Sequence, residues 1–120
     1  MLSALEEAIT CHSNQCYVAS SIMIRKSLDL LCIDRGATSA NLKQRIKSLG
    51  DKVLIPKELL EGMDDLRLLG NDAAHIESQV FDDVGKEEVE VGIEFSKEIL
   101  KAVYQYSSLL SKLKSLKKNP

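Results

Sequence analysis

Apolar residues recur at intervals of three and four positions along most of this sequence, which is the period of a helix with one buried face. Stretches that alternate apolar and polar residues, as a half-buried strand does, are almost absent. The pattern therefore predicts an all-α protein, and the short connections favour an antiparallel, up-and-down bundle of four or five helices. The predicted helices cover about residues 2–12, 15–34, 40–50, 56–70 and 86–116.

Glycine and short polar residues mark the expected end of the fourth helix. Pro56 suits its first turn, and Gly70 is expected to stop it. Asn71 or Asp72 should then cap one brief further turn. The mixed polarity of residues 76–85 predicts a loop before the last helix.

The helix over residues 15–34 is apolar around most of its circumference, so it is predicted to be the central, buried helix. Arg25 and Asp29 lie on its narrow polar side. Because they are four positions apart, they are expected to form an ion pair across one helical turn.

The helix over residues 86–116 is the longest that the pattern predicts. Glutamates gather in its first turns and lysines in its last, which matches the helix dipole at both ends. An apolar stripe with alternating spacings of four and three is typical of a coiled-coil seam and suits packing in a bundle or against a second chain. The stripe consists of Ile99, Val103, Tyr106, Leu110 and Leu113.

Composition places the chain among ordinary globular domains. It has 120 residues, 44% of them hydrophobic and 28% charged, which predicts a single domain over residues 1–120. The formal net charge of -2 is not that of a protein held to nucleic acid mainly by its phosphates. No apolar run approaches the roughly 20 residues that cross a bilayer, so we expect a cytoplasmic protein without membrane contact. The sequence opens almost directly on its first helix, which leaves open that it is an excerpt of a longer chain.

The cysteines do not suggest a disulfide framework. Cys11, Cys16 and Cys32 are odd in number and widely spaced, so we expect reduced thiols. A metal site built on Cys11, His12 and Cys16 is not favoured, because adjacent residues of a helix project in different directions and the sequence has no matching second pair. We therefore predict neither a metal nor a cofactor.

His75 is the most promising candidate for chemistry. It follows Asn71 by four positions and Arg67 by eight, so a helical path brings all three near one another. An imidazole exchanges protons near neutral pH, and a guanidinium holds a phosphate through two parallel hydrogen bonds. These are the parts of a metal-independent phosphodiesterase. The alternative is structural: His75 bonds to a backbone carbonyl, Asn71 caps a helix, and Arg67 pairs with one of the aspartates at positions 64 and 65.

Three runs of the sequence resemble a bacterial domain-of-unknown-function family, number 4145, which is itself grouped with the HEPN superfamily. They are the segments over residues 24–31, 42–49 and 66–75. The most specific piece is Arg67-x-x-Gly70-Asn71-x-x-Ala74-His75. The resemblance extends over about residues 4–110, which is nearly the whole chain.

This resemblance implies an HEPN-like helical bundle, usually a homodimer, from prokaryotic defence and toxin systems, sometimes fused to restriction-enzyme subunits. Active HEPN proteins are RNA endonucleases that need no metal. An arginine and a histidine from each protomer meet at the dimer interface, and the ribose 2′-hydroxyl attacks the phosphate. Carried over, His75 is the acid or base, Arg67 clamps the phosphate, and Asn71 orients one of them.

Two functions are therefore expected. One is a dimeric interaction or RNA-associated module whose partners are RNA or a protein of a toxin–antitoxin or restriction system. The alternative is a metal-independent RNA endonuclease that uses Arg67 and His75 across a dimer interface. The enzyme requires an open site at His75, whereas the module requires an exposed apolar groove or an extensive dimer surface.

Overall fold

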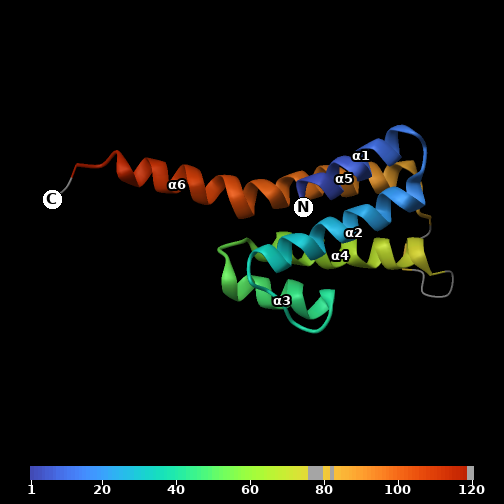
Figure 1. The fold of residues 1–120 in the computed structure, drawn as a ribbon, viewed down its shortest axis with the longest axis horizontal. Helices are drawn as coiled ribbons and strands as arrows, with labels where there is room; N and C mark the ends of the chain where they lie inside the picture. Colours follow the sequence, from blue (N-terminus) through green and yellow to red (C-terminus); the bar gives the residue numbers. More distant parts are fainter. Residues whose placement is uncertain (76–79, 82, 119–120) are drawn as a thin grey trace.

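The computed structural model describes residues 1–75, 80–81 and 83–118, and these residues form helices and connecting turns without any strand (Figure 1). This confirms the all-α prediction. The elements are α1 (Leu2–Ser13), α2 (Tyr17–Asp34), α3 (Leu42–Lys52), α4 (Lys57–Ala74), α5 (Lys86–Leu100), the π-helical turn η1 (Lys101–Gln105) and α6 (Tyr106–Ser115). Because α5, η1 and α6 follow one another without a break, we refer to them together as the rod.

Helix α2 is the centre of the bundle, as its apolar sequence predicted. It packs against α1, α3, α4 and α5. Ile24, Leu28 and Leu31 are completely buried on it. The hydroxyl of Ser20 donates a hydrogen bond of 2.6 Å to the carbonyl oxygen of Ala8, which fixes α1 along α2. Every other packed helix of the bundle is therefore positioned by α2.

Helix α4 does not stop at Gly70, and this corrects the prediction from the sequence. The helix continues through Ala74, so Asn71 and Asp72 are helical residues and not caps. A Cβ atom at Gly70 would lie only 2.7 Å from the Cβ of Arg25. Glycine is therefore required here because α2 and α4 approach closely, and not because the helix ends.

The predicted pair between Arg25 and Asp29 is wrong. The carboxylate of Asp29 instead accepts a hydrogen bond of 2.6 Å from Arg45 Nη1 on α3. Arg45 Nε also donates to the carbonyl oxygen of Ser39, at 2.8 Å. This partly buried ion pair joins α3 to α2 and leaves Arg25 to other contacts.

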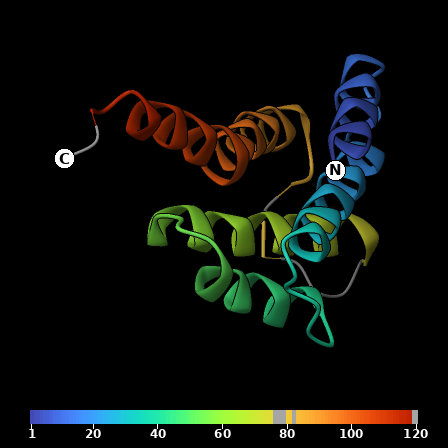
Figure 2. The same cartoon turned by 60° about the vertical axis from the view of Figure 1, so that its left-hand side comes forward.

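The rod leaves the bundle at its C-terminal half. Figures 1 and 2 show α6 extending away from the other helices, and among the described residues α6 comes close to η1 alone. The radius of gyration, 15.7 Å, accordingly exceeds the roughly 13.6 Å of a compact domain of this length. Of the predicted apolar stripe, Ile99 and Val103 are buried, whereas Tyr106, Leu110 and Leu113 are about half exposed. The packing prediction thus holds only for the first half of the stripe.

None of the helices in the described part of the chain combines the length and the apolar character that crossing a membrane requires.

We expect Gly70→Ala to lower the free energy of unfolding by about 1–3 kcal/mol, because the new methyl group forces α2 and α4 apart. The measurement is denaturant unfolding followed by circular dichroism. Gly50→Ala in α3 is the matched control: its methyl group would meet only the movable end of Leu60, at 3.0 Å, and alanine favours a helix over glycine by about 1 kcal/mol. Equal stability of the two variants would contradict the close approach at Gly70.

Candidate functional site

A polar cleft of about 270 Å³ lies between α2 and α4. We call it the α2–α4 cleft. Half of its lining comes from two turns of α2, and the other half comes from the last two turns of α4 and the residue that ends it. The residues are Ile22, Arg25, Lys26, Asp29, Gly70, Asn71, Ala74 and His75.

Two of the three predicted site residues line this cleft. His75 ends α4 in an extended conformation, is exposed, and donates its backbone N–H to the carbonyl oxygen of Asn71. Asn71 lies one turn earlier on the same face of the helix. The imidazole is therefore accessible, which is what a role in binding or catalysis requires.

Arg67, the third predicted residue, does not line the cleft. Its Nε donates a hydrogen bond of 2.8 Å to Asp64 Oδ1, and its side chain is only 14% exposed. The structural alternative foresaw this pairing with an aspartate. Because α4 runs on through Gly70, Arg67 stands about 80° around the helix from the position of His75 and more than two turns before it. The structure thus brings Asn71 and His75 together without Arg67.

Arg25 and Lys26 are cleft residues that the sequence did not reveal. The side-chain carbons of Arg25 lie against Gly70, and its Nε is buried without a hydrogen-bond partner among the described residues. Asp29 lies at the same cleft, but its carboxylate is engaged by Arg45. The available signal was an arginine on an otherwise apolar helix, and it was misassigned to the neighbouring aspartate.

This set of side chains suits an anion. A guanidinium and an ammonium supply positive charge, while an imidazole and an amide supply hydrogen bonds, and together they are typical of a phosphate site. Two helices contribute to the set, so its geometry depends on their packing and not on a flexible loop. The cleft therefore has the chemistry to hold one phosphate or carboxylate group.

Asp72 anchors the chain beyond α4. Its buried carboxylate accepts hydrogen bonds from the backbone N–H groups of Val80 and Phe81 through Oδ2, both at 2.7 Å. The predicted loop begins at residue 76, and its residues 76–79 and 82 lie outside the described part of the chain. Asp72 thus ties the start of the following segment to the last turns of α4, next to the cleft.

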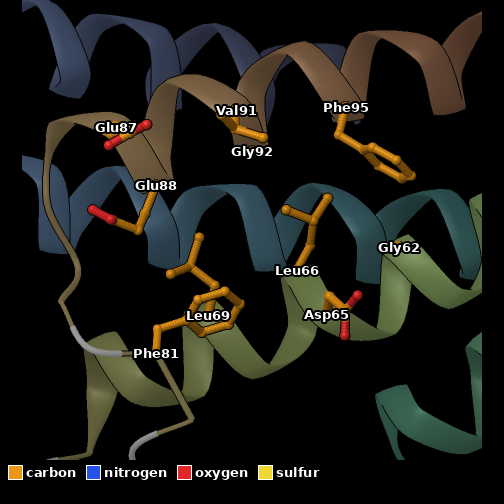
Figure 3. Close-up of a pocket in the computed structure, with 10 residues that line it drawn as sticks. All are labelled: Gly62, Asp65, Leu66, Leu69, Phe81, Glu87, Glu88, Val91, Gly92 and Phe95. Carbon is orange, nitrogen blue, oxygen red and sulfur yellow. The ribbon is translucent and has the colours of Figure 1, made fainter.

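A second hollow, of about 350 Å³, lies between α4 and α5 on another face of α4 (Figure 3). We call it the α4–α5 groove. Leucine, valine and phenylalanine side chains form most of its lining, and acidic side chains lie at its edges. The residues are Gly62, Asp65, Leu66, Leu69, Phe81, Glu87, Glu88, Val91, Gly92 and Phe95. This is the exposed apolar groove that the interaction-module hypothesis requires.

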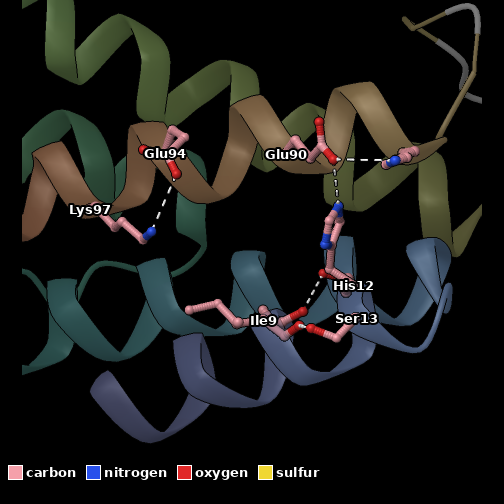
Figure 4. A network of polar contacts seen from close by, with 9 residues as sticks. Ile9, His12, Ser13, Glu90, Glu94 and Lys97 are labelled. Atoms are coloured by element: carbon pink, nitrogen blue, oxygen red, sulfur yellow. Dashed lines mark hydrogen bonds and ion pairs between the residues drawn. The ribbon is translucent and has the colours of Figure 1, made fainter.

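His12 has a structural environment. Its Nε2 lies 3.4 Å from Glu90 Oε1, and Lys86 Nζ lies 3.9 Å from the same oxygen (Figure 4). The imidazole also packs against the ring of Tyr17, with centroids 5.6 Å apart. His12 therefore links α1 to α5. Among the described residues, no three histidine, cysteine or acidic side chains gather where they could hold a metal ion.

Cys11, Cys16 and Cys32 are free thiols in very different surroundings. Burial, together with the nearby Asp29 carboxylate, raises the pKa of the Cys32 thiol to about 11, and Arg45 opposes this shift. The folded-state pKa lies above the unfolded one, so this thiol stabilises the fold below about pH 9, and its contribution is lost as the pH rises through about 11.

The fold and the two hollows define a small helical domain with a polar cleft on one side and an apolar groove on the other. The chain belongs to the family described as "Domain of unknown function (DUF4145)", which matches residues 6–119. The family part of the resemblance is thereby confirmed over nearly the whole chain. No curated protein and no solved structure matches the sequence.

We expect Asp72→Ala to lower the free energy of unfolding by at least about 2 kcal/mol, because each backbone N–H left without its acceptor costs about 1–3 kcal/mol. Asp72→Asn should lose less, since its amide oxygen still accepts. Chemical denaturation checks both, with Asp65→Ala on the exposed side of α4 as the control. A loss in Asp72→Ala no larger than in the control would show that these hydrogen bonds do not stabilise the fold.

We expect the three thiols to react at different rates with a disulfide reagent at pH 8. Exposed Cys16 should react quickly and half-buried Cys11 more slowly, while Cys32 should react only after unfolding, because it is buried and almost fully protonated. Variants that retain one cysteine each assign the rates. Rapid native labelling of Cys32 would contradict its burial.

Proposed function

We propose that this protein is an RNA-associated interaction module that holds a backbone phosphate of RNA in the α2–α4 cleft. The observation that carries the proposal is Arg25: its Nε is buried and lacks a hydrogen-bond partner among the described residues, and it lies in a cleft beside Lys26 and His75. A desolvated guanidinium is strongly stabilised by a bound anion. The resemblance to HEPN-like proteins suggests prokaryotic defence, toxin or restriction systems as the setting.

RNA suits the cleft better than a lone phosphate ion. Arg25 and Lys26 are adjacent on α2, so their side chains diverge by about 100° and favour successive phosphates of one strand. The side chains of Asn71 and neutral His75 both donate and accept hydrogen bonds, as recognition of a ribose 2′-hydroxyl requires. The exposed side chain of Ile22 adds an apolar edge at the cleft.

Local charge supports this proposal in spite of the overall charge of -2. The exposed lysines of α3, Lys43 and Lys47, lie on a helix that packs beside both α2 and α4. Most acidic residues of the rod lie on α5, on the opposite side of α4 from the cleft. The field at the cleft is therefore more positive than the formal sum, and binding is expected to weaken with salt.

Metal-independent cleavage of RNA is the second candidate. The exposed imidazole of His75 beside two cations favours it, since that pairing can move a proton and stabilise charge on a phosphate. In the form predicted from the sequence, Arg67 of a second protomer would have to leave Asp64 and reach His75. Binding without cleavage needs no such rearrangement.

Fluorescence anisotropy with labelled single-stranded RNAs, in chelator and at low salt, tests the binding proposal. We expect Arg25→Ala to weaken binding roughly tenfold or more, because a hydrogen bond to a charged group contributes about 1.5–3 kcal/mol. Lys26→Ala should reduce the dependence of log affinity on log salt by about one unit. Arg35→Ala, at the other end of α2, and Lys57→Ala are the matched controls.

The same samples distinguish the two functions. Intact RNA, with affinity lost in Arg25→Ala and kept in Arg35→Ala, supports the module. Fragments that end in 2′,3′-cyclic phosphate and disappear in both His75→Ala and Arg67→Ala support the endonuclease instead. If wild-type protein does not bind RNA, or all four alanine variants at positions 25, 26, 35 and 57 weaken binding equally, the cleft is not an RNA site.

A further inference from the structure

The leucines of α6 have no partner among the described residues of their own chain. Helix α6 comes close only to η1, and an isolated helix of this length is unstable in water. Its large apolar side chains lie on the surface, with exposed fractions between 46% and 80%. They are Tyr106, Leu109, Leu110, Leu113 and Leu116. A helix with so many exposed leucines calls for a covering surface.

The α4–α5 groove is a surface of matching chemistry on the same molecule. Its floor includes Gly92, where the absence of a side chain leaves room, and its wall includes Val91, which is 62% exposed. Phe95 and Leu66 complete an apolar trough. An amphipathic helix that presents leucines at spacings of three and four is the ligand that such a trough accepts. The α6 helix of the same chain points away from the groove and does not fill it (Figure 1).

Charge selects the orientation of the ligand helix. Residues 86–100 of the rod contain five glutamates and two lysines, whereas residues 106–118 contain four lysines and no acidic residue. The edges of the groove add Asp65 to Glu87 and Glu88. Two rods side by side in antiparallel orientation place the basic half of each against the acidic half of the other, whereas parallel rods place like charges together.

We propose that two copies of this chain form a dimer in which the rods lie antiparallel, so that α6 of each copy occupies the α4–α5 groove of the other. A twofold axis near Ala102 places Leu113 opposite Val91 and Lys117 opposite Glu87, since each pair lies equally far from that residue along the rod. The α2–α4 cleft lies on another face of α4. The dimer therefore does not depend on the proposed phosphate binding, and either proposal can fail alone.

Light-scattering mass and sedimentation velocity across a range of concentrations test the dimer. We expect the wild type to have the mass of two chains. Leu113→Asp should weaken dimerisation at least tenfold, because the new carboxylate would be buried in the groove. Val18→Asp is the matched control, since Val18 is a similarly exposed apolar residue on α2, at 51%. Circular dichroism confirms that both variants are folded. A monomeric wild type at about 100 µM, far above the Kd of a stable specific dimer, overturns the proposal.

Charge reversal distinguishes this arrangement from others. Lys114→Glu with Lys117→Glu should weaken the dimer, and so should Glu87→Lys with Glu88→Lys. All four changes in one chain should restore it, because both halves of the rod are then inverted. If two α6 helices paired with each other, removing the lysines would not weaken the dimer. That result, or a failure of the fourfold variant to recover, overturns the antiparallel arrangement.

Discussion

The close approach of α2 and α4 at Gly70 is the constraint on which the rest of the structure depends. It brings the stem of Arg25 against the backbone of α4, and it allows the apolar side of α2 to be buried from several directions at once. It also sets the width of the α2–α4 cleft, because both walls belong to the two helices in contact. The core and the candidate site are thus two results of one contact.

Helix α4 separates two chemically different surfaces. Positions 69 and 71 lie about 200° apart around a helix, so Leu69 faces the apolar groove while Asn71 faces the polar cleft. The sequence of α4 shows this as apolar and polar residues in close succession after Met63. A single helix therefore presents a surface for an anion and another for a protein partner, and the two can be changed independently.

The period of the apolar residues predicted the class of fold, the central position of α2 and the extent of the rod, because these follow from local pattern. What it missed depended on contacts between helices. Gly70 looks the same in sequence whether it ends a helix or admits a neighbouring side chain, and only the position of Arg25 decides between them. Asp29 had a suitable partner four residues away, yet Arg45 of α3 has the better geometry. For the same reason Arg25 was not recognised as a member of the candidate site, whereas Asn71 and His75 were found from their spacing.

The π-helical turn η1 has a consequence for how this rod can change. It lies between the half that packs in the bundle and the half that projects from it, at residues 101–105. Adding or removing one residue there would rotate the whole of α6 by about 100° without altering its composition. The leucines would then face a different direction, while the bundle upstream kept its packing. The turn thus acts as a phase adjuster: a single insertion or deletion re-aims an entire helix at a new neighbour.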